Sequence, residues 1–214
     1  MYMPRYHALT DLAQQQAHID RYPLGAWVCT AAGTLVANHI PFVLDRSQGP
    51  HGRLIGHVSR ANPVWRQLGE GAASVVMFMG AQAYITPSWY PGKHSHGKVV
   101  PTWNYVTVHA HGVARAHEDA QWIATMLHSL THAQESGRPV PWSLDDLPPD
   151  YLRQKLRAIV GIELVIERLE GRLKVSQDED TADRQGTVDG LRREPGTDAH
   201  AVATLVERAL QEEQ

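Results

Sequence analysis

The sequence has little cysteine and no long apolar run. One cysteine occurs in 214 residues, which excludes an internal disulfide, and Cys29 lies in the apolar run 26–30, where we expect a buried, unreactive thiol. No run of 18 apolar residues could cross a membrane as a helix, and the first residues lack the apolar core of a signal peptide. We therefore expect a soluble, cytoplasmic protein with no membrane partner.

The sequence also lacks a marked excess of one charge and several familiar motifs. Its net charge is -3 and its pI is about 6.5, whereas a protein that binds nucleic acid over a broad surface is usually basic. Any DNA binding must then come from a local patch or a partner. The sequence contains no Gly-x-Gly-x-x-Gly, Walker loop, nucleophile elbow or helix-turn-helix pattern, so a phosphate, if bound, is not held by a glycine loop.

Hydrophobic residues (43%) and charged residues (20%) are in the range of globular proteins. Alternating apolar patterns predict short strands, and 3.6-residue patterns predict helices between them. The irregular order of these elements favours a mainly β, α+β fold, an antiparallel barrel with peripheral helices. The expected strands are 26–31, 34–42, 54–59, 74–78, 83–86, 106–117 and 161–169; the expected helices are 10–21, 119–131 and 150–158.

The C-terminal part has a different character. It is charged from Gln177 onward and ends in a segment with apolar residues at helical spacing: Val202, Leu205, Val206, Ala209 and Leu210. A lone helix of this length is marginal in water, so it should pack on the body or on a second subunit. We expect a barrel domain over residues 1–175 and a C-terminal helical extension over 176–214.

One strand-to-helix junction gathers donors suited to an anion. The apolar, β-branched run 54–59 predicts a strand, and Asn62 followed by proline predicts a helix start. His57, Ser59, Arg60 and the N–H groups of the helix's first turn could together hold a phosphate. Side chains alternate along a strand, so they converge only if the chain bends at Arg60. The alternative is a solvated arginine beside an ordinary helix cap.

Aromatic residues gather around residues 89–90 and 103–105. Trp103, Asn104 and Tyr105 could supply the apolar wall and polar group that a flat ring such as a flavin or haem requires. Aromatic residues of a barrel are also ordinary core material. Further on, the segment from Lys174 to Gln177 offers an amine, a hydroxyl and an amide to a ligand or partner subunit, or it is a strand end with a solvated lysine.

The 13 histidines raise the question of a metal site. The spacing places two imidazoles close together at 94 and 96 and again at 109 and 111. No cysteine or clear carboxylate completes either pair, so we assign no metal. A single exposed histidine that ligates haem stays open as an alternative.

Together, these motifs resemble the PaiB-like family of FMN-binding negative transcriptional regulators. The matching segments are Met1-Tyr-Met-Pro4, Asn38-His-Ile-Pro-Phe42, Gly56-His-Val-Ser-Arg-Ala-Asn-Pro63, Tyr84-Ile-Thr-Pro-Ser-Trp-Tyr-Pro91, Val99-Val-Pro-Thr-Trp-Asn-Tyr105, Val108-His109 with Gly112, and Lys174-Val-Ser-Gln177. They span nearly the whole chain in the family's order.

The resemblance implies a flavin-reductase-like split β-barrel, a homodimer that binds FMN at the subunit interface, and a role in repression that includes possible DNA binding. By matching positions, the FMN phosphate ligands are Ser59 and Arg60, with His57 close by. The other candidate cofactor residues are Asn62, Trp103, Asn104, Tyr105, Lys174 and Gln177.

Two positions depart from the family pattern. Asp178 stands where asparagine usually follows Lys-x-Ser-Gln, and it would repel a phosphate that it faced. His7 replaces the usual early phenylalanine. The sequence leaves two further functions open: an FMN-dependent oxidoreductase related to pyridoxamine 5′-phosphate oxidase or flavin reductase, and a haem-binding split barrel. It contains no obvious general acid or base, which favours binding over catalysis.

Overall fold

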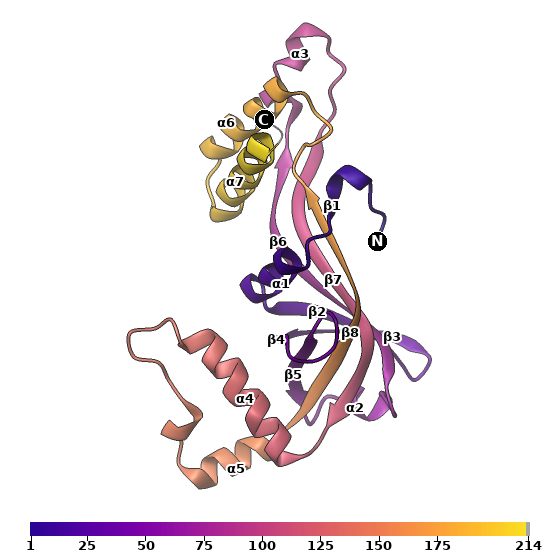
Figure 1. Ribbon diagram of the computed structural model, residues 1–214, viewed down its shortest axis with the longest axis vertical. Helices are drawn as coiled ribbons and strands as arrows, with labels where there is room; N and C mark the ends of the chain where they lie inside the picture. Colours follow the sequence, from indigo (N-terminus) through magenta and orange to yellow (C-terminus); the bar gives the residue numbers. More distant parts are fainter. Residues whose placement is uncertain (213–214) are drawn as a thin grey trace. The chain divides into compact units, whose positions relative to one another are not determined.

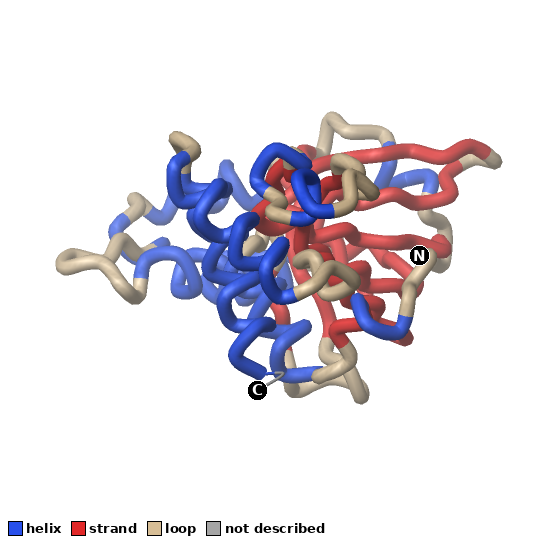
Figure 2. Tube along the Cα trace, turned by 90° about the horizontal axis from the view of Figure 1, so that it is seen from above, coloured by secondary structure: helices blue, strands red, loops and turns tan. Residues whose placement is uncertain are grey.

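The computed structural model describes residues 1–212 and is dominated by a mixed-length antiparallel sheet (Figures 1 and 2). The strand order is β3-β2-β6-β7-β8-β5-β4, and β1 pairs with β8. The strands are β1 (Ala8–Leu9), β2 (Leu24–Ala31), β3 (Thr34–Pro41), β4 (Val43–Asp45), β5 (Arg53–Ser59), β6 (Ala72–Ile85), β7 (Thr102–His117) and β8 (Ile159–Lys174).

Short and medium helices connect and follow these strands. The α-helices are α1 (Leu12–Arg21), α2 (Val64–Gln67), α3 (Gly92–Ser95), α4 (Ala120–Glu135), α5 (Pro149–Arg157), α6 (Thr181–Arg193) and α7 (Thr197–Glu212). The 3₁₀ helices are η1 (Arg5–His7), η2 (Pro87–Trp89) and η3 (Leu144–Asp146). Within residues 1–212, none of the helices is both long enough and apolar enough to span a bilayer.

The sheet curls back on itself near β3 and β5. β2 and β3, which match the predicted strands 26–31 and 34–42, form a hairpin. Its two turn residues have positive φ angles, 48° at Ala32 and 78° at Gly33, as the right-handed twist of a hairpin favours. β3 ends the strand order, yet Asn38 on β3 accepts a hydrogen bond from Asn62 just after β5 (2.7 Å). The hydrogen bond joins β3 to the end of β5, two strands that are far apart in the strand order, so the sheet closes toward a barrel. This is the arrangement of a split barrel, and the predicted fold class is confirmed.

The chain forms two compact units that are not continuous in sequence. The barrel unit contains residues 15–78 and 109–169, and the helical unit contains the described residues 1–14, 79–108 and 170–212. β6, β7 and β8 contribute residues to both. The predicted division at residue 175 stays a prediction, but residues 176–212 pack with strand residues of the helical unit.

The barrel unit is held by a large apolar interior and by α4. Trp27, Phe78 and Leu54 are fully buried side chains of this interior. α4 begins where the sequence predicts, because the Asp119 side chain accepts the N–H of Trp122 (2.8 Å). Cys29 is buried and free, as expected, and burial raises the pKa of its thiol.

The helical unit has a core of its own, in which α6 and α7 pack against the end of β6 (Figure 1). The predicted apolar stripe of the last helix is confirmed. Its members either belong to the buried cluster or pack against it: Val202, Leu205, Val206, Ala209 and Leu210. The helix therefore packs on its own chain.

Candidate functional site

The first group of predicted ligands surrounds the end of β5 in the barrel unit. The chain turns at Arg60, whose backbone N–H donates to the carbonyl of Ala158 (2.8 Å), so the required bend is present. α2 has only four residues. Its first turn offers fewer free donors than expected, because Asn62 Oδ1 accepts the N–H of Val64 (3.0 Å) and Pro63 has no N–H.

Arg60 is held in place by its own chain. Its Nε donates to the carbonyl of Arg157 (2.8 Å), and its Nη2 donates to that of Ile159 (3.2 Å). The remaining edge of the guanidinium pairs through Nη1 with Glu118, a carboxylate more than half exposed to solvent. The indole of Trp65 lies 5.6 Å from the guanidinium and donates to the Arg60 carbonyl (3.1 Å). Two backbone bonds therefore orient this arginine toward an exposed anion.

The neighbouring predicted ligands are arranged differently. Ser59 is exposed, and its Oγ accepts the N–H of Ala61 (3.3 Å), which leaves its own hydroxyl hydrogen for a ligand. Within residues 1–212, the buried Nδ1 of His57 has no hydrogen-bond partner, and burial lowers the pKa of this imidazole. Asn62 uses its amide to join the junction to β3. The end of β5 thus offers a charged group, a hydroxyl and a neutral imidazole.

The predicted ring wall lies in the helical unit, and its residues point in alternate directions. Trp103 is 52% exposed, whereas Asn104 is fully buried and donates to Ser176 Oγ (2.8 Å). Tyr105 is half-buried, with the Arg172 guanidinium 5.4 Å from its ring. Successive strand residues face opposite sides, so the structure does not bring all three into one wall. Their role as flavin ligands stays a prediction.

Lys174 is the last residue of β8, and Gln177 follows three residues later. Lys174 Nζ donates to the hydroxyl of Thr102, and burial lowers the pKa of the amine. The Gln177 amide folds back on the strand: it accepts the N–H of Val175 (2.7 Å) and donates to the carbonyl of Leu173 (2.6 Å). Gln177 is therefore occupied as a cap of β8, and Lys174 is the member of this pair with donors left for a ligand.

Sequence reasoning missed the basic group beside Lys174. Arg172 donates through Nη1 to the carbonyl of Tyr2 (3.1 Å), and its Nη2 lies 3.4 Å from His7 Nδ1. The opposite nitrogen of His7 lies 3.9 Å from Asp178. Burial lowers the pKa of His7; Asp178 acts in the opposite direction, and Arg172 and Lys174 lower it further. The two departures from the family pattern thus meet in space, a signal that sequence position alone did not give.

The two histidine pairs differ in their surroundings. His96 follows α3, and its ring lies with Asp180 and Asp183 of the helical unit, with possible ligand atoms within 4.8 Å of one another. These carboxylates are distant in sequence, so the sequence did not reveal them. However, His96 Nδ1 accepts the N–H of Lys98 (3.1 Å). The ring hydrogen then belongs on Nε2, so in this tautomer Nε2 is a hydrogen-bond donor and has no lone pair for a metal.

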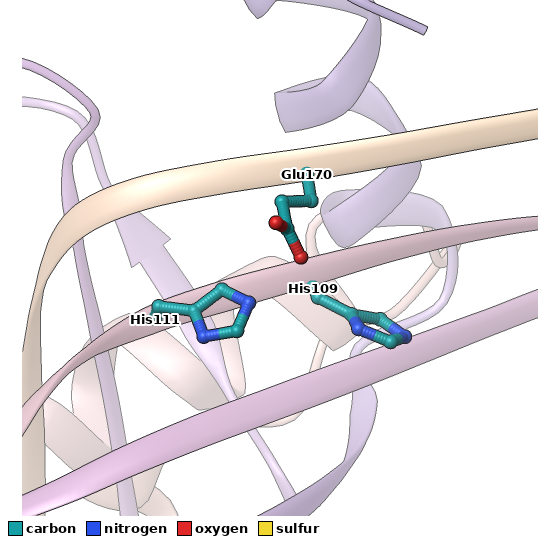
Figure 3. Close-up of side chains that lie close together, drawn as sticks. All are labelled: His109, His111 and Glu170. Atoms are coloured by element: carbon teal, nitrogen blue, oxygen red, sulfur yellow. The ribbon is translucent and has the colours of Figure 1, made fainter. Parts of the chain in front are cut away.

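The second pair, His109 and His111, projects from β7 as the two-residue alternation predicts (Figure 3). The ring centroids are 6.3 Å apart and the planes are tilted by 51°. Both side chains are half-buried and each takes part in an interaction within the protein. They are therefore not exposed imidazoles of the kind that the haem alternative requires.

Comparison with known families decides the kind of ligand. Residues 1–168 match the model of a family described as "Putative FMN-binding domain". The chain belongs to this family. It is a PaiB-like flavin-binding protein with FMN as its cofactor. The match includes the junction after β5, whereas Lys174 and Gln177 lie beyond its end.

Similar proteins support the family and the fold. The Bacillus subtilis (strain 168) protein "Protease synthase and sporulation protein PAI 2" is 30% identical over 213 residues, covering 100% of both chains. Two solved structures share the fold at lower identity. The "FAD and Heme binding protein from Mycobacterium smegmatis" has a TM-score of 0.59 and 19% identity, covering 85% of this chain and 78% of that one. The "Flavocytochrome Anf3 from Azotobacter vinelandii" has a TM-score of 0.56 and 18% identity, covering 86% and 78%.

Proposed function

We propose that this protein is a cytoplasmic, homodimeric transcriptional regulator of the PaiB type that binds FMN through the junction after β5. The family supports the cofactor, and the name of the Bacillus subtilis relative, which refers to sporulation and protease synthesis, supports regulation. The net charge of -3 argues against a broad DNA-binding surface. Direct DNA contact therefore requires a local basic patch or a partner.

The observation that carries the FMN site is the setting of Arg60. Two backbone carbonyls fix the guanidinium, and its third edge already holds an exposed carboxylate, that of Glu118. A phosphate monoester carries more charge than a carboxylate and matches the fork of an arginine equally well. We infer that the FMN phosphate replaces Glu118 on Arg60, with the Ser59 hydroxyl as a second donor.

The absorbance spectrum of the purified protein tests the cofactor. We expect flavin bands, either in the protein as isolated or after titration with FMN. A Soret band would contradict the proposal in favour of the haem-binding alternative. Rapid NADH or NADPH oxidation by the flavin-loaded protein would favour the oxidoreductase alternative over regulation.

Two measurements test the regulatory part. Sedimentation velocity with and without FMN should show a dimer, and a monomer at all micromolar concentrations would contradict the assembly. Selection of genomic DNA fragments by the FMN-loaded protein at modest salt should enrich discrete sites. If no DNA site is enriched, either with or without FMN, direct repression is excluded and regulation must act through a partner.

A further inference from the structure

The helical unit contains an open cleft. The aromatic cleft, as we call it, has a volume of about 670 Å³, which is in the usual range for small-molecule sites. It lies between the paired strand ends of β6 and β7 and the connection from α6 to α7. Its lining residues are Gln82, Ala83, Tyr84, Thr86, Trp89, Trp103, Leu191 and residues 194–199.

Two of its walls are aromatic rings that remain open to solvent. Tyr84 is 49% exposed and Trp103 is 52% exposed. The two rings meet edge to face with their centroids 6.2 Å apart, an arrangement that fixes both planes. Exposed aromatic rings in a concave site are a recurrent feature of ligand-binding surfaces.

The third aromatic wall, Trp89, is seated firmly on α6. A Cβ atom at Gly190 would lie 2.1 Å from the Trp89 ring, and one at Gly186 would lie 2.1 Å from its carbonyl oxygen. These two glycines are one helical turn apart, so together they form a slot for the tryptophan. The cleft is therefore built on a rigid element and not on a mobile side chain.

The charge of the cleft is negative. Glu194 and Asp198 line it, and none of its lining residues is a lysine, arginine or histidine. Asp198 is in the first turn of α7, where the helix dipole favours an acid. Glu194 caps the C-terminal end of α6, where the dipole disfavours one. Arg192, two residues before Glu194, pairs with Glu207 of α7.

We propose that the aromatic cleft binds a small organic cation. Aromatic faces attract an ammonium group through their quadrupoles, and carboxylates complete the balance of charge. The same carboxylates repel a phosphate, so this site is separate from the one that holds the FMN phosphate. The proposal assigns Trp103 to the cation cleft in place of the flavin wall, and it does not depend on FMN binding.

Choline and its neutral isostere 3,3-dimethylbutan-1-ol test the proposal on the full-length protein. The two molecules have nearly the same shape, and only choline carries a charge. In calorimetric titrations and by tryptophan fluorescence, we expect choline to bind about tenfold more tightly than the isostere, with an affinity that falls at higher salt. Equal affinities, or no binding of choline at millimolar concentrations, would overturn the proposal.

Three variants locate the site. Trp103→Ala should abolish choline binding, and Glu194→Gln should weaken it several-fold while leaving the urea midpoint unchanged. Trp142→Ala removes an exposed tryptophan of the barrel unit and should leave binding unchanged. Equal loss in Trp142→Ala and Trp103→Ala would overturn the proposal. So would a change from dimer to monomer in Trp103→Ala, because the cleft would then be an interface between copies of the chain.

Discussion

At the scale of single residues, Arg60 and Lys174 show how surroundings decide which predicted cation suits a phosphate. Arg60 is oriented by backbone carbonyls, and its partner Glu118 is exposed and replaceable. Lys174 donates to a neutral hydroxyl, and burial lowers its pKa. A guanidinium stays protonated across the physiological pH range, whereas a buried amine loses its proton more readily. We therefore assign the phosphate to Arg60.

A second set of charged residues stabilises the barrel unit. Arg53 pairs with Asp45 (2.9 Å) and Glu163 (2.7 Å), and Glu163 also contacts His117 (2.8 Å). Burial raises the pKa of Glu163, but hydrogen bonds from Arg53 and His117 outweigh this, so the pKa is lowered overall. The hydrogen bond from the Ser47 hydroxyl is the main cause that lowers the pKa of Asp45. Both carboxylates are thus stabilised in the ionised form.

This network predicts a loss of stability in acid. A carboxyl whose folded pKa lies below its unfolded pKa contributes its full stabilisation above the unfolded value and loses it as the pH falls through the folded value. For Glu163 the loss should begin near the ordinary value of 4.5 and continue below it. Glu163→Gln should lower the free energy of unfolding by about 2–3 kcal/mol at pH 7, measured by urea titration, and by clearly less at pH 3.5.

The matched control is Glu167→Gln, an exposed glutamate on the same strand, which should change stability little at either pH. A difference between wild type and Glu163→Gln that stays constant from pH 7 to pH 3.5 would show that the network does not stabilise the charged carboxylate.

The slot on α6 predicts the cost of a single methyl group. At Gly186 a Cβ atom would meet the backbone oxygen of Trp89, which cannot move without shifting η2. Alanine is a better helix former than glycine, but overpacking against backbone costs more than this gain. Gly186→Ala should lower the free energy of unfolding by about 1–3 kcal/mol. Gly137→Ala is the control and should leave the free energy of unfolding unchanged, because a Cβ atom there meets nothing within 4 Å. An unchanged urea unfolding midpoint for Gly186→Ala would contradict the close packing of Trp89 on α6.

At the scale of elements, the strand and helix positions that periodicity predicts agree with the structure, except that one long strand is predicted as two short ones. The sequence predicts separate strands over 74–78 and 83–86, yet β6 runs unbroken from Ala72 to Ile85. Its burial pattern changes phase at Gly80 and Ala81, which are both buried, so the strand continues while its buried face switches. Glycine also occurs inside helices: α3 begins at Gly92, and α6 includes Gly186 and Gly190, on which Trp89 packs.

The C-terminal helix gives the prediction at this scale. Val206 is fully buried in the core of the helical unit, so Val206→Ala should lower the free energy of unfolding by about 2 kcal/mol through lost burial and the cavity that remains. Arg208→Ala is the control: Arg208 is exposed, two residues further along the same helix, and its replacement should have little effect. If thermal or urea unfolding of Val206→Ala matches wild type, then α7 does not contribute to the core.

At the scale of the whole molecule, the sequence predicts the fold well because seven motifs in order and the strand periodicities point to the same barrel. The junction after β5 was predictable because its residues are contiguous. The group formed by His7, Arg172 and Asp178 was not, since its members are brought together only by the pairing of β1 with β8 and the turn that follows. For the aromatic cleft, the sequence predicts that aromatic residues near 89 and 103 gather, but it does not predict the acidic wall, because Glu194 and Asp198 come from the distant connection between α6 and α7.

The ratio of the FMN and riboflavin affinities tests the central claim most directly, because the two ligands differ only by the phosphate. Arg60→Ala should weaken FMN binding by roughly tenfold or more and leave riboflavin binding nearly unchanged. Arg66→Ala, an exposed arginine of α2 that also lies over Trp65, should leave both unchanged. Equal losses for FMN and riboflavin in Arg60→Ala, or no loss for either, would contradict a phosphate site at the end of β5.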